Sequence, residues 1–150
     1  MPYLTSVVYE LLRLYPPVSQ LINRVTREPA VLGGKIAIPA NTWVGWNAYG
    51  VQIDKRIWGP TAQKFVPERW GTTVEEMQSM FRKETVRGTY IPFNAHTRKC
   101  LGQGFALLEM KIILFELARR VEWTIHPDYK LKLTSVSIPR RDCSILSVSS

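Results

Sequence analysis

The chain has 150 residues, of which 45% are hydrophobic, and this composition excludes a disordered or low-complexity protein. Its 20 basic and 12 acidic residues give a net charge of +8, which is spread over both halves of the chain. Two cysteines in a chain of this length exclude a disulfide scaffold. No run approaches the ~18 apolar residues of a membrane helix, and the first residues show no signal-peptide pattern.

Apolar residues near the start recur at intervals of three and four from Leu4 to Tyr15, which predicts a helix that ends at Pro16-Pro17. Gly33-Gly34 stands between two short apolar runs and predicts the turn of a hairpin. Short elements are therefore expected in this order: a strand over 20–26, the hairpin over 31–38, a strand over 42–46 and a helical turn near 47–51. The segment from there to Phe65 is predicted to be irregular.

The second half of the chain predicts two helices, one around 75–82 and a longer one over 103–121. Apolar residues lie on nearly every side of the longer helix, and a helix of this kind is buried in a large core. The other 131 residues offer one other strong helix to cover it. Short strands are expected over 122–125, 130–136 and 143–148. The pattern as a whole predicts a fold that is mainly α with a small β-sheet.

Cys100 lies in the segment Pro92-Phe93-Asn94-Ala95-His96-Thr97-Arg98-Lys99-Cys100-Leu101-Gly102, just before the longest helix. The two basic residues before it and the helix N-terminus both favour the thiolate, which is the form that binds a metal or attacks an electrophile. Only His96 stands near enough to share a metal. A single anionic sulfur therefore suits a metal whose other ligands come from elsewhere, such as a macrocycle. The alternative is an ordinary half-buried cysteine, or one paired with Cys143.

Glu10 and Arg13 stand at i, i+3 of the first helix, so they share a face and can bond directly. Taken alone, this pair is explained by an ordinary surface contact. The helix around it is apolar, however, and Arg69 is a candidate to complete a buried network, because buried charges must be paired. Arg24 and Arg98 suit bidentate binding of carboxylates, with two solvated arginines as the alternative.

The order of these motifs resembles the C-terminal part of the cytochrome P-450 family, the haem-thiolate monooxygenases. The family patterns are E-x-x-R, then P-E-R-F, then F-x-x-G-x-R-x-C-x-G. The matching segments are Glu10-x-x-Arg13, then Pro67-Glu68-Arg69-Trp70, then Phe93-x-x-x-x-Arg98-x-Cys100-x-Gly102. The resemblance covers essentially all 150 residues, and the sequence looks fungal, similar to enzymes of the spore-wall dityrosine (N-formyltyrosine oxidase) type.

The resemblance implies a haem b cofactor, iron protoporphyrin IX, with Cys100 as the proximal iron ligand. Phe93 would pack beside the sulfur and Gly102 would belong to the same cofactor-binding loop. Arg98 would pair with a haem propionate, and Arg24 stands where the family has another propionate partner.

The resemblance also implies that Glu10, Arg13 and Arg69 form a structural charge triad. The helix over 4–14 would be the family's K helix and the helix over 103–121 its L helix. The strands within 20–47 would form the small sheet beside the substrate channel. The stretch over 71–88 would be a lengthened meander before the cysteine loop.

Two positions depart from the family patterns. His96 stands where the cysteine loop usually has a glycine that eases a tight bend. A residue other than glycine there must bear a positive φ, or the bend is shared by Ala95 and Thr97, or haem binding is weakened. Trp70 in place of the usual Phe is a mild change.

The family's oxygen-activating helix, with its acid–Thr pair, lies upstream of the E-x-x-R helix, and no such segment occurs here. We therefore expect residues 1–150 to be the C-terminal portion of a single domain, without its N-terminal portion and membrane anchor. No catalytic residue beyond the haem ligand is expected. The parent enzyme would insert one atom of O2 into a small organic substrate, with electrons from NADPH through a flavoprotein reductase. It would lie on the cytosolic face of the endoplasmic reticulum membrane.

Two alternatives belong to other classes of function. The first is a truncated, non-catalytic fragment or pseudogene product. The second is a basic module that binds nucleic acid or protein, although the even spread of charge and the scattered tryptophans argue against nucleic acid. Basic residues could also face an acidic reductase surface or form an ordinary solvated face; they are Arg98, Lys99, Lys111, Lys83 and Arg87.

Overall fold

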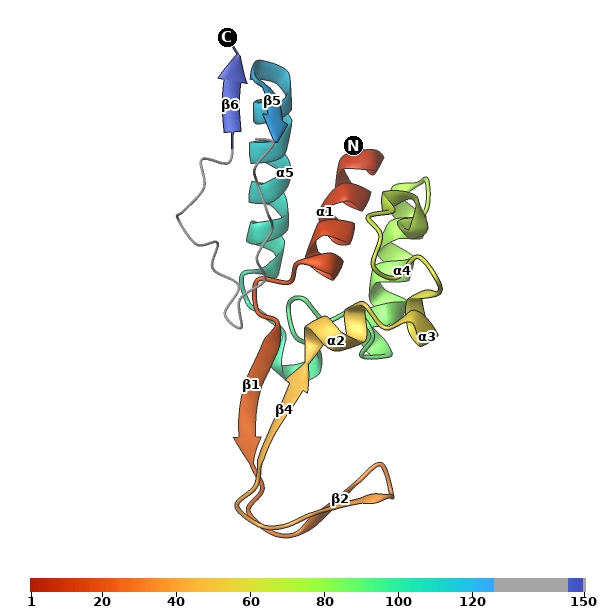
Figure 1. Ribbon diagram of the computed structural model, residues 1–150, viewed down its shortest axis with the longest axis vertical. Coiled ribbons are helices and arrows are strands. Elements are labelled where there is room, and N and C mark those ends of the chain that lie inside the picture. The colour runs from red at the N-terminus through yellow and green to blue at the C-terminus, as the bar shows by residue number, and fades with distance from the viewer. Residues whose placement is uncertain (126–145, 150) are drawn as a thin grey trace.

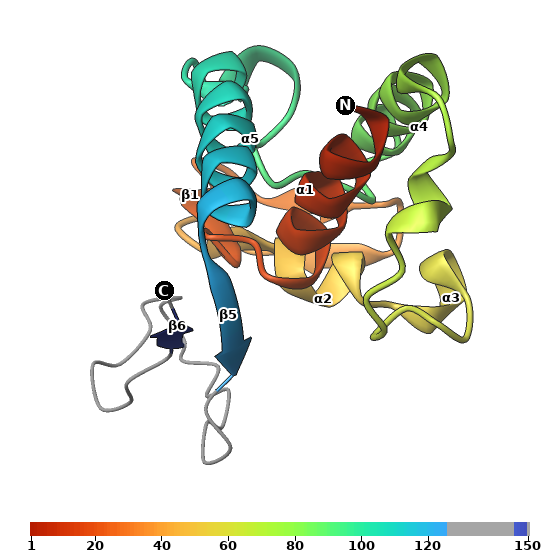
Figure 2. The same ribbon diagram turned by 90° about the horizontal axis from the view of Figure 1, so that it is seen from above.

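Helix α1 (Pro2–Leu14) begins with a proline in its first turn, where the missing N–H costs no helical hydrogen bond. The computed structural model describes residues 1–125 and 146–149. In it α1 lies between α4 (Val74–Val86) and α5 (Gln103–Arg120), as the view from above shows (Figure 2). The predicted helix over the first 15 residues is therefore confirmed, and it is the central element of the helical part.

Strands β1 to β4 extend away from the helices as two narrow ladders (Figure 1). β1 (Gln20–Val25) pairs antiparallel with β4 (Trp43–Asn47), and β2 (Ala30–Leu32) pairs antiparallel with β3 (Ile36–Ile38). Gly33 and Gly34 connect β2 to β3 with φ values of 59° and 72°. Two successive positive φ values are what a tight hairpin turn requires, so the Gly-Gly turn is confirmed.

The segment between β4 and the long helices contains more structure than its sequence indicated. α2 (Ala48–Gln52) confirms the expected helical turn, but α3 (Lys55–Trp58) lies where an irregular chain was expected. Asp54 begins α3 by accepting the Arg56 N–H at 2.8 Å. A 3₁₀ turn follows over Pro67–Trp70. α4 begins at a capping box of Thr73 and Glu76 and is longer than predicted.

The last described elements are a 3₁₀ turn (His96–Arg98), α5, and the antiparallel pair β5 (Glu122–Ile125) and β6 (Leu146–Ser149). In the part of the chain that is described no α5 residue is buried, so the large core that its apolar pattern predicts is not formed by the described residues. Phe105 and Leu108 of α5 are 72% and 58% exposed. The predicted strand over 130–136 and Cys143 lie outside the described residues.

The hydrophobic core lies between α1, α3, the first 3₁₀ turn and α4. Aromatic rings dominate it, and the ring centroids of Trp70 and Tyr90 are 4.6 Å apart. Its buried members are Val8, Tyr9, Leu12, Trp58, Ala62, Trp70, Met77 and Tyr90. The fold is thus mainly α with small antiparallel ladders, as predicted. Over residues 1–125 and 146–149, every helix is too short or too polar to cross a membrane.

Candidate functional site

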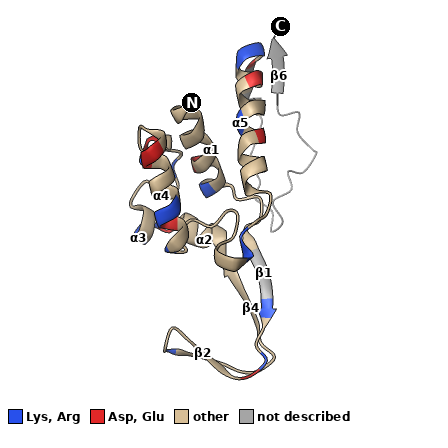
Figure 3. Ribbon diagram, turned by 180° about the vertical axis from the view of Figure 1, so that it is seen from behind, with Lys and Arg blue, Asp and Glu red and all other residues tan. Residues whose placement is uncertain are grey.

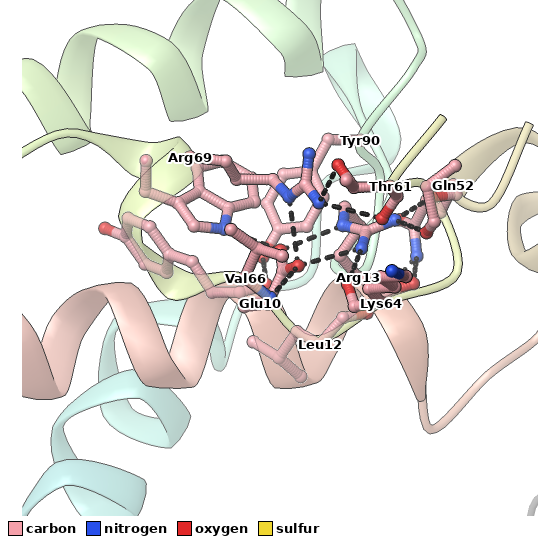
Figure 4. A network of polar contacts seen from close by, with 12 residues as sticks. Glu10, Leu12, Arg13, Gln52, Thr61, Lys64, Val66, Arg69 and Tyr90 are labelled. Atoms are coloured by element: carbon pink, nitrogen blue, oxygen red, sulfur yellow. Dashed lines mark hydrogen bonds and ion pairs between the residues drawn. The ribbon is translucent and has the colours of Figure 1, made fainter. Parts of the chain in front are cut away.

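Glu10 and Arg13 lie one turn apart on the inner face of α1, and both side chains are fully buried. Arg13 donates from Nη2 and Nε to the two carboxylate oxygens of Glu10, at 2.8 and 2.9 Å (Figure 4). This bidentate geometry is the strongest form of an arginine–carboxylate pair. A buried ion pair is nevertheless tolerated only when its other polar atoms also have partners.

The remaining donors of Arg13 all bind backbone carbonyl groups. Nη1 donates to the carbonyl oxygens of Gln52 and Ala62, both at 2.6 Å, and Nη2 donates to that of Lys64 at 3.2 Å. Each of the five N–H groups of the guanidinium therefore has an acceptor. Because these carbonyls lie between α2 and the 3₁₀ turn at residue 67, Arg13 fixes that whole segment to α1.

Arg69 and Trp70, from the same 3₁₀ turn, complete the shell around Glu10. Arg69 Nε donates to Glu10 Oε1 at 3.0 Å, so the structure brings the three predicted charges together. Trp70 Nε1 donates to Glu10 Oε2, also at 3.0 Å. Sequence reasoning treated this tryptophan as a mild replacement for phenylalanine, and its indole donor was missed.

Glu10 is held in its charged form. Burial raises the pKa of this carboxyl, but hydrogen bonds from Arg13, the Val66 N–H and Arg69 outweigh burial and lower the pKa below its ordinary value of 4.5. The Val66 N–H lies 3.0 Å from Glu10 Oε1. Near neutral pH the network therefore carries one carboxylate and two guanidinium groups.

The cysteine loop (residues 92–102) is closed by a backbone hydrogen bond from the Cys100 N–H to the Phe93 carbonyl at 2.8 Å. Cys100 is an exposed, free thiol. A Cβ added at Gly102 would lie 4.0 Å from Cys100 Sγ, which places this glycine next to the sulfur. Phe93 is half-buried and packs against the core cluster. The loop therefore presents a thiol at the surface while its base is held by the core.

His96 bears the bend of the loop itself, with φ of 54°. Ala95 is extended at φ −141°, so it does not share the bend as one sequence-based alternative proposed. Asn94 has φ of 61°, and its Oδ1 accepts the Ala95 N–H at 2.8 Å. The left-handed backbone conformation is about 1–2 kcal/mol less favourable for a residue that has a Cβ. Asparagine adopts this conformation more readily than histidine.

A hollow of about 960 Å³ opens beside the cysteine loop. Its walls come from the β1–β4 ladder and from the loop, and they include Arg24, Trp46, Ile91, His96, Arg98 and Lys99. The two arginines predicted to bind carboxylates thus line one hollow, although they lie far apart in the sequence. Lys99, the chain neighbour of Cys100, lines the same hollow.

Comparison with known proteins identifies the family. A family model described as cytochrome P-450 matches residues 1–141. The chain belongs to the cytochrome P-450 family. It is 72% identical over 137 residues to the cytochrome P-450 monooxygenase xanG of Aspergillus fumigatus, covering 91% of this chain and 26% of that protein. It is 39% identical over 134 residues to cytochrome P-450-DIT2 of Saccharomyces cerevisiae, covering 89% of this chain and 27% of that protein.

Solved structures of cytochromes P-450 share the fold. One crystal structure matches with a TM-score of 0.70 at 30% identity, over 98% of this chain and 30% of that one. The haem domain of a cytochrome P-450DA mutant matches with a TM-score of 0.73 at 21% identity, over 97% of this chain and 29% of that one. The chain spans between a quarter and a third of each of these relatives.

Gln52, like Trp70, is a buried residue whose hydrogen bonds the sequence did not indicate. It is fully buried at the end of α2, and its side chain hydrogen-bonds to residues of α1 and to the Ile91 N–H. No local pattern predicts the hydrogen bonds of such a residue, because its partners lie 39 and 40 positions away in the sequence. The available signal was a glutamine among apolar residues at the end of a short helix.

Proposed function

We propose that residues 1–150 form the cysteine-side, C-terminal portion of a single haem-binding domain in a monooxygenase. The observation that carries this proposal is an exposed, free Cys100 in a loop whose residues Arg98 and Lys99 line one hollow together with Arg24. The loop and the hollow supply a thiol for a metal and cationic groups for carboxylates. These are the features that a haem with two propionates needs.

In this proposal Cys100 is the iron ligand, Gly102 leaves room beside the sulfur, and Phe93 supports the loop from the core side. Arg24 and Arg98 hold the propionates from two sides of the hollow. When bound, the haem supplies the iron at which dioxygen is activated, and the cysteine thiolate donates electron density to it.

The charge network has a structural role in this proposal. Among the described residues, Glu10, Arg13 and Arg69 neither line the hollow nor hydrogen-bond to the cysteine loop, and Arg13 ties backbone segments together instead. We therefore assign to them the task of holding the core on which the loop rests.

The activity proposed for the whole protein follows its relatives. It inserts one atom of O2 into a small organic substrate and takes electrons from NADPH through a flavoprotein reductase. It acts at the cytosolic face of the endoplasmic reticulum membrane. The chain by itself is proposed not to turn over substrate, because positioning the substrate and excluding side reactions needs walls on both sides of a cofactor. Hydroxylation by the purified chain with a reductase would contradict this last point.

Haem titration of the chain tests the assignment of residues. The reduced protein with carbon monoxide is expected to show the red-shifted band of a thiolate-ligated haem, and Cys100→Ser is expected to abolish it. Arg24→Gln and Arg98→Gln are expected to weaken haem binding. Arg27→Gln is the matched control, because Arg27 is exposed and is not among the lining residues. A band that survives in Cys100→Ser would refute the ligand assignment.

Retention on nucleic acid tests the alternative of a basic binding module. Acidic and basic residues both occur along α4 and α5 (Figure 3), so these helices offer no surface of one sign to a phosphate backbone. Salt-sensitive retention on nucleic acid is therefore not expected.

A further inference from the structure

Gln52 connects the charge network to the cysteine loop through one buried side chain. Its Nε2 donates to the carbonyl oxygens of Leu12 and Arg13 at 3.2 and 3.0 Å. Its Oε1 accepts the Ile91 N–H at 3.0 Å. Figure 4 shows Gln52 beside Arg13 at the end of α1.

The orientation of this amide is determined by its partners. Two carbonyl oxygens on one side require the NH₂ group, and an N–H on the other side requires the oxygen. Leu12 and Arg13 belong to the last turn of α1, whose carbonyl groups have no partner within the helix. Gln52 thus caps α1 with both of its donors and keeps its acceptor for Ile91.

Ile91 is the point from which the cysteine loop departs. Its carbonyl accepts the Asn94 N–H at 3.1 Å, and two residues later the Phe93 carbonyl accepts the Cys100 N–H at 2.8 Å. Tyr90, the residue before it, is fully buried and donates its hydroxyl to the Tyr9 carbonyl at 3.0 Å. The base of the loop is therefore attached to α1 by two buried side chains.

We propose that Gln52 is a positioning residue for Cys100: it fixes the base of the cysteine loop at Ile91 relative to the last turn of α1. Its action on the thiol passes through Ile91 and Phe93, because Gln52 does not line the hollow and its side-chain hydrogen bonds go to Leu12, Arg13 and Ile91. The consequence for haem ligation rests on the function proposed above, whereas the consequence for the loop does not.

Amide hydrogen exchange in the full chain tests the effect on the loop. Gln52→Met keeps the length of the side chain and removes its hydrogen bonds. Exchange at the Ile91 and Cys100 amides is expected to become about tenfold faster relative to α4 amides. Val8→Ala is the matched control, since Val8 is fully buried in α1 and belongs to the same core. It is expected to leave that ratio unchanged.

A conservative variant separates positioning from general loss of stability. In Gln52→Glu the introduced carboxyl, when ionised, accepts the Ile91 N–H but repels the two carbonyl oxygens. When protonated it regains one donor. Burial and the two carbonyl oxygens raise the pKa of such a carboxyl and the neighbouring Arg13 guanidinium lowers it, so loop protection is expected to recover only once the pH is low enough to protonate the carboxyl, and the same change of pH in Gln52→Met is expected to restore nothing.

Haem ligation provides the second readout. With haem bound, Gln52→Met is expected to lower the share of the thiolate band in the reduced carbon monoxide complex, whereas Val8→Ala keeps the wild-type share. The inference would be overturned if the exchange rates of the Ile91 and Cys100 amides, relative to those of α4 amides, were equal in Gln52→Met and Val8→Ala. If the wild-type chain binds no haem but the exchange results hold, the proposed function fails and the positioning role stands.

Discussion

Trp70 and Trp58 allow the hydrogen bond at Glu10 to be measured separately from the packing around it. Both indoles are buried in one cluster, with 1% and 8% of their surfaces exposed and ring centroids 5.9 Å apart. Trp70 Nε1 donates to Glu10 Oε2 at 3.0 Å. Trp58 Nε1 has no hydrogen-bond partner among residues 1–125 and 146–149. Replacing each tryptophan by phenylalanine removes the same atoms and leaves an aromatic ring, which at position 58 still faces the Arg13 guanidinium that lies 5.1 Å from the Trp58 ring centroid.

The difference between the two variants is expected to be about 2 kcal/mol or more, with Trp70→Phe the less stable. Both variants lose packing, but Trp70→Phe also loses a hydrogen bond to a charged group, which contributes about 1.5–3 kcal/mol. Trp58→Phe removes an N–H whose burial is itself unfavourable, and this gain offsets part of its lost packing.

Urea unfolding followed by far-UV circular dichroism measures both free energies without relying on tryptophan emission. The decline of stability at acid pH supplies a second check of the hydrogen bond. Trp70→Phe removes a hydrogen bond from the charged carboxyl, so the pKa of Glu10 is expected to rise towards its ordinary value of 4.5, and the loss of stability as the pH falls below 4.5 is expected to be smaller than in the wild type. Equal losses of stability in Trp58→Phe and Trp70→Phe would refute the assignment of the hydrogen bond.

Three further outcomes follow from the same structure. Arg13→Lys offers three donors where five are used, and it is expected to cost about 3–5 kcal/mol in urea unfolding, the range for breaking a buried pair. His96→Gly relieves left-handed backbone but adds freedom to the unfolded chain, so a net gain of about 1 kcal/mol or less is expected, seen as a higher Tm. Because the pKa of Glu10 is lowered, its contribution to stability is complete above its ordinary value of 4.5. That contribution is lost as the pH falls below 4.5, and Glu10→Gln is expected to flatten the acid limb of a pH titration of stability.

Local patterns predicted the parts of this fold that local chemistry determines. The helix that carries Glu10 and Arg13, and the Gly33-Gly34 turn, each follow from a few adjacent residues, and both were expected where they lie. The four-residue helix α3 was missed because its one signal, the cap at Asp54, is a single residue.

Contacts between distant segments could not be predicted in this way. The hydrogen bonds of Gln52 and Trp70 span between 39 and 60 positions, and no periodicity encodes such partners. Arg69 was a candidate for the network because buried charges must be paired, and the family resemblance then implied the same triad, but spacing did not indicate it. The apolar pattern of α5 predicted a helix, which is confirmed, but a pattern cannot say which residues would cover its apolar sides.

The Glu10 network also sets an order of events during synthesis. Glu10 and Arg13 leave the ribosome together, but the Trp70 indole follows the carboxylate by 60 positions. At about 5–20 residues per second, that interval lasts about 3–12 s. Until it ends the Glu10 carboxylate lacks its indole donor, whereas the carbonyl partners of Arg13 at Gln52, Ala62 and Lys64 have already been made. Complete burial of the ion pair is therefore expected only after the turn at residues 67–70 has been synthesised.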